Sequence, residues 1–594
     1  MSFGHLQAAW ADWLLDGLVA AGVRRAVVSP GSRSTPLVLA AARAEAAGRL
    51  EVTVVPDERS AGFVALGQAR VTGVPSLLVC TSGTAGAHWL PAVIEASETG
   101  IPLLALTADR PFELQARGAN QTIEQAGLFG RHVRAFVELG GADPDPRACI
   151  ALPRTAARAV QVSLVPDPGP VHLNARFRKP LQVLPPEPPD VTALRARVTA
   201  AAERGVPRPR RVRLLPDAAD LDALATRLRR ARRGVLVAGP LTPADALREE
   251  AVRRFLAASG FVLLAEATSQ LRFGLPRPHA ACDAFEPLLA APPERRVLQP
   301  DFVLQVGLVP SGRGLAAWLM GEEAPERVVL AARGWPEGFN RAADVWVTDP
   351  SAALEGLADR MEGAAPEADW AGRAAAAAGR TWEILDGLLA GRPGFLEAAA
   401  VRAAVEAVPE GGLLALGNSL PVREVDLFCP ASGRRFGVLS QRGASGIDGL
   451  VSGAAGAVAA SGRPGVLLLG DVSFLHDVGG LAAARDLPAP LAVVVLRNGG
   501  GRLFELLPVR EHPGTETLFH RLFLTDPRLE AAVAGQAFGV PSVVADTPGA
   551  LREALSAALE RPGATLVEAR VDGEATAALV ADLNRAVAAE VRTG

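Results

Sequence analysis

The sequence predicts an α/β protein built from three doubly wound domains, each around a parallel sheet. Short apolar runs alternate with helical stretches, and many of these runs end in small polar residues, which is typical of βαβ units. The chain has 594 residues, too many for one hydrophobic core at roughly 100–200 residues per domain. With 49% hydrophobic and 21% charged residues, its composition is that of globular domains.

The first domain is expected over residues 1–185. Three of its apolar runs end at Val28, Cys80 and Leu106, and each is followed by a loop of small residues before a helical stretch. The proline-rich segment 184–189 should form a stiff linker at its end.

Two further α/β domains are expected over 200–370 and 385–594. In the first of these, residues 234–240 form the clearest strand and turn. The arginine-rich run 227–233 is interpreted as the polar face of a helix rather than a nucleic-acid contact. The alanine-rich stretch 363–380 is expected to be a helical connection to the last domain.

Charge and cysteine content exclude several classes of protein. A net charge of −3 offers no electrostatic basis for binding nucleic acid or membrane, and no apolar run approaches the ~20 residues needed to span a bilayer. The first residues do not resemble a signal peptide, and the cysteines are too scattered for a Cys-X-X-Cys pair, so we expect a cytoplasmic protein with reduced thiols. Lysine occurs only at Lys179, so arginine has to bind anions.

Polar residues follow two apolar runs in the last domain. Asp471 and Ser473 come directly after one run, and Asn498 follows the other, with Gly500 close behind. Ligands of open α/β sheets bind at the carboxyl ends of strands. The Asp471 and Asn498 side chains and the Gly500 carbonyl would supply three oxygen ligands for Mg²⁺, or Mn²⁺, completed by phosphate oxygens and water. The alternative is a pair of ordinary strand-to-loop turns.

This pattern resembles the diphosphate-anchoring signature of thiamin diphosphate (ThDP) enzymes, with Gly-Asp-Val-Ser in place of Gly-Asp-Gly. Other runs resemble the 2-succinyl-5-enolpyruvyl-6-hydroxy-3-cyclohexene-1-carboxylate synthase family (MenD) of menaquinone biosynthesis. The matching runs are 29–36, 57–59, 81–84, 107–111, 118–121, 417–419, 442–449 and 470–473. The resemblance implies pyrimidine-binding, central and diphosphate-binding domains, an active site built between two subunits of a homodimer, and usually a homotetramer.

The resemblance also implies a reaction on two small anions. 2-Oxoglutarate would be decarboxylated, and the succinyl unit, carried on ThDP, would be added to isochorismate, with release of CO₂. One alternative is another ThDP-dependent 2-oxoacid decarboxylase or carboligase, similar to acetolactate synthase. A second is a nucleotide-binding regulatory protein that uses the turn at Gly239, although no Gly-X-Gly-X-X-Gly motif accompanies it.

Residue roles follow from the same resemblance. Glu58 would donate to the pyrimidine N1′ of ThDP, Ile447 would pack between its two rings, and Ser473 would lie near the diphosphate. The substrate contacts implied are Ser419 and Arg423 for the distal carboxylate of 2-oxoglutarate, Ser32, Arg33, Arg110 and Gln121 for isochorismate, and Arg442 and Arg313 as further active-site arginines. One departure is that Gly314 stands where the family often has arginine.

Overall fold

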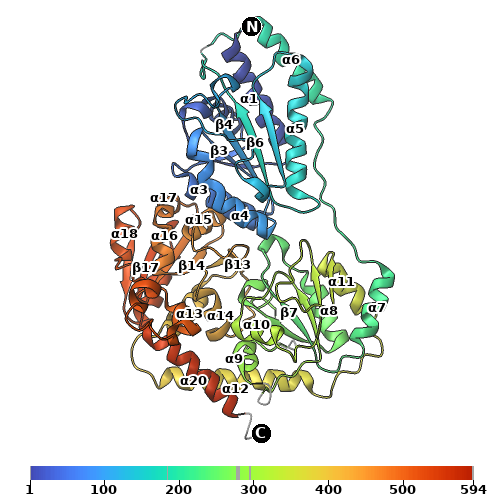
Figure 1. The fold of residues 1–594 in the computed structure, drawn as a ribbon, viewed down its shortest axis with the longest axis vertical. Coiled ribbons are helices and arrows are strands. Elements are labelled where there is room, and N and C mark those ends of the chain that lie inside the picture. The colour runs from blue at the N-terminus through green and yellow to red at the C-terminus, as the bar shows by residue number, and fades with distance from the viewer. Residues whose placement is uncertain (1, 184, 276–280, 293–295, 591–594) are drawn as a thin grey trace. The chain divides into compact units, whose positions relative to one another are not determined.

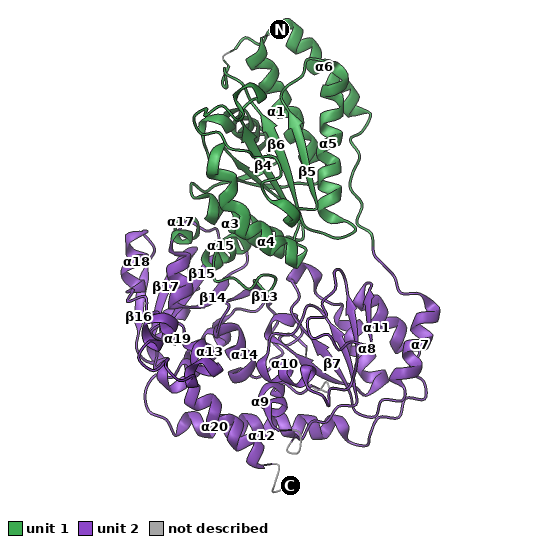
Figure 2. Ribbon diagram, in the orientation of Figure 1, with its two compact units in different colours: residues 1–212, 441–461, 479–484 green, residues 213–440, 462–478, 485–594 purple. Residues whose placement is uncertain are grey.

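The computed structural model describes residues 2–183, 185–275, 281–292 and 296–590 (Figure 1). It contains three all-parallel sheets, as predicted, with strand orders β2-β1-β3-β4-β6-β5, β11-β10-β9-β7-β8 and β13-β12-β14-β15-β17-β16. The chain forms two compact units (Figure 2). Unit 1 comprises residues 1–212, 441–461 and 479–484, and unit 2 comprises 213–440, 462–478 and 485–594.

The first sheet lies in unit 1. Its strands are β1 Arg25–Val28, β2 Glu51–Val54, β3 Ser76–Cys80, β4 Leu103–Asp109, β5 Ala135–Gly140 and β6 Pro170–Arg176. The helices of this unit are α1 Phe3–Ala20, α2 Thr35–Ala46, α3 Glu58–Thr72, α4 Leu90–Thr99, α5 Pro146–Leu164, α6 Pro189–Glu203, α15 Leu450–Ser461 and α17 Leu481–Ala484.

The central strands of the first sheet are buried because both faces are covered, whereas the edge strands β2 and β5 are partly exposed. Successive residues point to opposite faces, so Val28 packs in the core formed with α1, α2 and α5, while Val27 packs in the core formed with α3 and α4. This is the doubly wound arrangement that the strand and helix alternation predicts.

Unit 2 holds the other two sheets. Their strands are β7 Gly234–Ala238, β8 Val262–Ala265, β9 Phe302–Val306, β10 Glu326–Ala331, β11 Asp344–Val347, β12 Leu413–Leu416, β13 Gly437–Ser440, β14 Gly465–Gly470, β15 Pro490–Arg497, β16 Ser542–Ala545 and β17 Gly563–Arg570. The helices are α7 Ala218–Leu228, α8 Glu249–Ser259, α9 Phe285–Ala290, α10 Arg313–Met320, α11 Pro350–Ala358, α12 Trp370–Ala390, α13 Glu397–Ala407, α14 Pro421–Phe428, α16 Asp471–His476, α18 Ala531–Ala537, α19 Pro548–Ala558 and α20 Glu574–Glu590.

Helices α3 and α15 pack at backbone distance inside unit 1, although they are far apart in sequence (Figure 2). A Cβ added to Gly67 would lie 2.0 Å from the Gly453 carbonyl oxygen, and one added to Gly456 would lie 2.0 Å from the Val64 carbonyl oxygen. Only glycine fits at either contact.

Three local predictions were wrong. Strand β4 continues to Asp109 because its last residues pair with β6. Of the arginine run 227–233, only Arg227 is helical, since α7 ends at Leu228 and the chain must turn into β7; Arg227 pairs with carboxylates of β10 and β11. Helix α12 begins only at Trp370 and extends to Ala390. Among the described residues, no helix is both long and apolar enough to cross a bilayer.

Candidate functional site

Asp471 joins the carboxyl ends of β14 and β15, which are neighbours in the third sheet. It is 3% exposed, and its Oδ2 accepts hydrogen bonds from Gly499 N at 3.0 Å and Gly500 N at 3.1 Å. Its Oδ1 accepts from Val472 N at 2.7 Å. The two strand ends singled out in the sequence therefore form one loop cluster.

Asn498 offers a buried acceptor to this cluster. Its Nδ2 donates to Glu397 Oε1 at 2.9 Å, while its Oδ1 is buried and has no hydrogen-bond partner. Buried amide oxygens are normally paired, so this atom is suited to a cation or an incoming donor. Gly500 has a φ of +112°, and an added Cβ would lie 2.1 Å from the Leu524 carbonyl, so the backbone comes closer here than any other residue would allow.

The electrostatics of the cluster favour a positive ion. Desolvation raises the pKa of Asp471, and it raises the pKa of Glu397 to about 7 despite the hydrogen bonds from Asn498 and Thr576. A buried carboxylate with an orphaned amide oxygen beside it is the ligand chemistry of Mg²⁺. The Gly500 carbonyl already accepts from Arg502 N at 2.8 Å and keeps a second lone pair. Ser473 is buried in α16. These residues fit a metal and a diphosphate.

The predicted succinyl contacts also lie in unit 2. Arg423, on α14, donates from Nη1 to the Ser419 carbonyl at 2.6 Å, and Ser419 has a φ of +72°. Desolvation lowers the pKa of the Arg423 guanidinium, which the charges of Glu266 and Glu286 partly offset. The structure brings Ser419 and Arg423 together in one turn.

The predicted isochorismate contacts follow strands of the first sheet. Arg33, 3% exposed, donates from its backbone N to Thr81 Oγ1 at 3.2 Å and from Nη1 to the Phe177 carbonyl at 2.5 Å. Gln121 Nε2 donates to the Ser82 carbonyl at 2.9 Å, and Ser82 Oγ returns a bond to the Gln121 carbonyl at 3.1 Å. The loop with Ser32 and Arg33 and the loop with Gln121 thus both contact the end of β3.

Asp109 fixes the backbone next to Arg110, a role that the sequence did not reveal. It is 0% exposed, and it accepts from Arg110 N at 2.6 Å, Asn174 Nδ2 at 3.0 Å and Arg176 Nη1 at 2.9 Å. The bond to Arg110 fixes the backbone of that arginine, whose own Nε is buried without a partner. The only signal in the sequence was the position of Asp109 inside the Thr107–Pro111 run.

Glu58, Arg442 and Ile447 all belong to unit 1. Glu58 is the first residue of α3, where Asp57 caps the helix by accepting from Arg59 N at 2.9 Å. Arg442 and Ile447 lie in the segment that leads into α15, the helix that packs on α3.

The region around Arg313 explains the departure at Gly314. Arg313 begins α10, is exposed, and donates to the Leu506 carbonyl. A Cβ on Gly314 would lie 2.2 Å from the Glu286 carbonyl oxygen, so an arginine side chain has no room there unless α9 moves. Glu286 is buried and accepts from Gly314 N at 2.8 Å and Leu315 N at 3.1 Å, which fixes the start of α10.

Four of the predicted substrate arginines share one property. Among the described residues, no carboxylate forms an ion pair with Arg33, Arg110, Arg313 or Arg423. By contrast, the buried structural arginine Arg70 pairs with Glu95 at 2.8 Å. A buried cation favours an anionic partner, and Arg33 is 3% exposed, so its surroundings suit an anionic ligand. Arg110 and Arg423 are half-buried and Arg313 is exposed, so the same argument is weaker for the first two and does not apply to Arg313.

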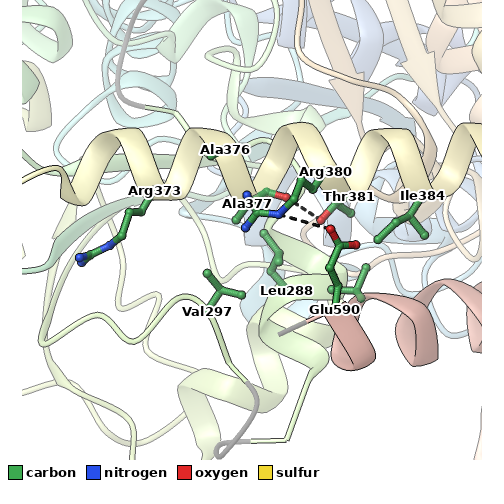
Figure 3. Close-up of a pocket in the computed structure, with 10 residues that line it drawn as sticks. Leu288, Val297, Arg373, Ala376, Ala377, Arg380, Thr381, Ile384 and Glu590 are labelled. Atoms are coloured by element: carbon green, nitrogen blue, oxygen red, sulfur yellow. Dashed lines mark hydrogen bonds and ion pairs between the residues drawn. The ribbon is translucent and has the colours of Figure 1, made fainter. Parts of the chain in front are cut away.

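A cavity of about 520 Å³ lies elsewhere in unit 2, lined by α9, α12 and α20 (Figure 3). Its walls are mostly apolar, and its Arg380 and Glu590 form an ion pair with each other at 3.5 Å. None of the predicted site residues lines it. We assign it no catalytic role.

Comparisons with known proteins agree with the geometry. Residues 9–128 match the family model of the thiamine pyrophosphate enzyme N-terminal TPP binding domain, and residues 434–569 match that of the C-terminal TPP binding domain. The chain is 45% identical to a 2-succinyl-5-enolpyruvyl-6-hydroxy-3-cyclohexene-1-carboxylate synthase of Sorangium cellulosum, covering 99% of this chain and 97% of the relative. A synthase of the same name from Myxococcus xanthus is 39% identical, covering 97% and 96%. The crystal structure of benzoylformate decarboxylase from Polynucleobacter necessarius matches with a TM-score of 0.67 at 17% identity, covering 95% of this chain and 98% of that one, and shows the shared fold.

Proposed function

Because the chain belongs to the 2-succinyl-5-enolpyruvyl-6-hydroxy-3-cyclohexene-1-carboxylate synthase family of thiamin diphosphate enzymes, we propose that it joins a succinyl unit from 2-oxoglutarate to isochorismate with loss of CO₂. The product is the compound for which the relatives are named, an intermediate of menaquinone biosynthesis. The observation that carries the proposal is the set of arginines without carboxylate partners, because both substrates are dianions.

The diphosphate end of the cofactor belongs at the β14–β15 edge. Asp471, Asn498 Oδ1 and the Gly500 carbonyl would hold Mg²⁺, or Mn²⁺, and Ser473 would contact the diphosphate. When bound, ThDP supplies a carbon nucleophile that attacks the 2-oxo group and an electron sink for the charge left by CO₂ loss. Ile447 would supply the apolar contact between the two rings of the cofactor.

Glu58 would hold the proton that activates the cofactor. Its carboxyl would donate to the pyrimidine N1′ and so would favour the tautomer in which the pyrimidine can act as a base. The position at the start of α3, after an edge strand, leaves its side chain only half-buried and available to a ligand.

Different arginines bind the two substrates. Arg423 with Ser419 binds the distal carboxylate of 2-oxoglutarate, and Arg33, Arg110, Gln121 and Ser32 bind isochorismate. Arg442 and Arg313 add positive charge to the site. Orienting both fragments before the carbon–carbon bond forms converts the joining step into an effectively unimolecular one.

The organisation of the chain is part of the proposal. We assign residues 1–185 to a pyrimidine-binding domain, 200–370 to a central domain and 385–594 to a diphosphate-binding domain, supported by one sheet in each range. The active form is a homodimer at least, assembled as a homotetramer, which light scattering would check. Four buried free cysteines support a reducing compartment such as the cytoplasm.

Mass spectrometry of the products tests the reaction directly. With 2-oxoglutarate, isochorismate, ThDP and Mg²⁺, the purified protein should form the named carboxylate and CO₂. Replacing 2-oxoglutarate with pyruvate should abolish the product, since pyruvate has no distal carboxylate for Arg423. Comparable turnover of pyruvate would favour an activity similar to acetolactate synthase and contradict the proposal.

A further inference from the structure

The segment 441–449 is built into unit 1 rather than into the unit that holds the third sheet (Figure 2). It carries Arg442 and Ile447, two residues of the proposed site, and it continues into α15. The residues that fix the backbone path of this segment therefore belong to unit 1.

A buried carboxylate on α4 accepts the backbone of this segment. Glu95 is 2% exposed, its Oε2 accepts from Ala444 N at 2.7 Å, and its Oε1 accepts from Gly443 N at 3.2 Å. Arg70 on α3 donates to the same Oε1 at 2.8 Å, with its own side chain 6% exposed. Desolvation raises the pKa of Glu95, while the Arg70 charge and both backbone N–H groups lower it.

Tight contacts hold the segment on both sides of Ile447. A Cβ at Gly443 would lie 2.8 Å from Glu98 Cβ, so the backbone lies directly on α4. At the far end, Gly449 has a φ of +65°, and a Cβ there would lie 1.9 Å from the Phe63 ring. With both ends fixed, the position of Ile447 depends on the backbone that Glu95 holds.

The chemistry of the pair argues against a role in stability alone. An apolar pair of similar volume would join α3 and α4 at least as well as a desolvated ion pair. A carboxylate at this place does what an apolar side chain cannot, because it accepts from two backbone N–H groups that no helix or strand satisfies.

We propose that Glu95 is a positioning residue of the active site, which with Arg70 fixes the backbone at Gly443 and Ala444 and so places Arg442 and Ile447. The expected effect on the reaction rests on the proposed function, through the roles given to those two residues. The hydrogen bonds of Glu95 to the backbone do not depend on that function, and their effect can be measured separately.

Glu95→Gln is the informative variant. It keeps the size of the side chain, but it replaces one acceptor oxygen with an NH₂ group, so at least one of the two backbone N–H groups or Arg70 faces a donor. Glu98→Gln is the matched control, since Glu98 is the same residue type one turn further along α4 and is exposed. Arg70→Gln/Glu95→Gln avoids leaving a buried arginine unpaired and serves if the single variant folds poorly.

Hydrogen exchange of the 441–449 peptide, followed by mass spectrometry without ligands, measures how well its backbone amides are protected. We expect exchange to rise about tenfold or more in Glu95→Gln and in the double variant, and to stay at the wild-type rate in Glu98→Gln. ThDP titrations measure the Kd for the cofactor, and steady-state kinetics measure KM and kcat. In Glu95→Gln, the Kd for ThDP and the KM for isochorismate should rise by a larger factor, several-fold, than the factor by which kcat falls.

Unchanged exchange at 441–449 in Glu95→Gln, or an equal change in Glu98→Gln, would overturn the inference. Faster exchange with unaltered Kd and KM would also overturn it, since the backbone would then be held for stability alone. If the wild-type protein did not bind ThDP at all, the proposed function would fail, while the exchange experiment would still decide whether Glu95 holds the segment.

Discussion

Asp471 Oδ2 accepts the Gly500 N–H across 3.1 Å and so holds the ends of two adjacent strands against each other. This contact predicts the effect of Asp471→Ala. Losing a buried charged ligand costs roughly 2–5 kcal/mol, so the ThDP affinity should fall by tens to thousands of fold. Isothermal titration with ThDP at fixed Mg²⁺ measures this affinity. Asp486→Ala, at a position 78% exposed, is the control and should bind ThDP as tightly as the wild type does. Wild-type affinity in Asp471→Ala would place the diphosphate elsewhere.

Glu58→Gln should separate cofactor binding from cofactor activation. Glutamine keeps the size of the side chain at the start of α3 but cannot share an acidic proton with the pyrimidine N1′. The ThDP affinity should therefore change little, while turnover falls by about a hundredfold or more. Hydrogen–deuterium exchange at the thiazolium C2 is the direct measurement, and exchange at the wild-type rate would move the activating role to another residue.

Arg423→Ala and Arg33→Ala should impair different half-reactions. Loss of one partner of a desolvated charge contact slows the affected step by tens to thousands of fold, for a cost of roughly 2–5 kcal/mol. Arg423→Ala should lose CO₂ release from 2-oxoglutarate. Arg33→Ala should release CO₂ in a single turnover but fail to form the joined product. Rapid quench with ¹⁴C-labelled 2-oxoglutarate reads both steps, and the opposite pattern would exchange the two substrate positions.

His172 should make the stability of the first α/β unit depend on pH. It is 0% exposed, stacks edge-on against Phe129, and shares a hydrogen bond between Nε2 and Thr107 Oγ1 at 2.9 Å. Desolvation lowers its pKa from 6.5 to about 4. Between these values the unfolded chain binds a proton that the folded protein excludes, so the free energy of unfolding falls as pH falls, by up to ~3 kcal/mol at roughly 1.4 kcal/mol per pH unit. Above the upper value the effect is absent.

Urea unfolding midpoints of wild type and His172→Gln, taken at about pH 7.5 and about pH 5, measure this contribution. The glutamine variant should lose less stability on acidification, because it has no group to protonate. His512→Gln, at an exposed position, should follow the wild type. Equal acid sensitivity in wild type and His172→Gln would assign the effect to other groups.

Local patterns in the sequence predicted the ends of β14 and β15 well, although they placed the end of β4 too early. The apolar run before Asp471 is long enough to fix β14, and parallel strands bring their carboxyl ends to one edge, so Asn498 could be placed beside it. The unit to which 441–461 belongs was not predictable in this way, because it depends on contacts between Gly67 and Gly453 across most of the chain. Glu95 and Glu397 were missed for a related reason, since a buried carboxylate has no local signature when its partners are distant in sequence.

The close packing of α3 on α15 joins two helices that the ribosome synthesises at different times. Helix α3, which carries the contact glycine Gly67, is synthesised early. Helix α15 is synthesised only after β12 and β13. Throughout that interval the face of α3 around Gly67 has no covering helix from its own chain, and transiently exposed surface of this kind makes a folding chain prone to aggregate. A fragment that ends before residue 441 would lack α15 and keep this face of α3 uncovered, so we expect it to be less soluble than the full chain.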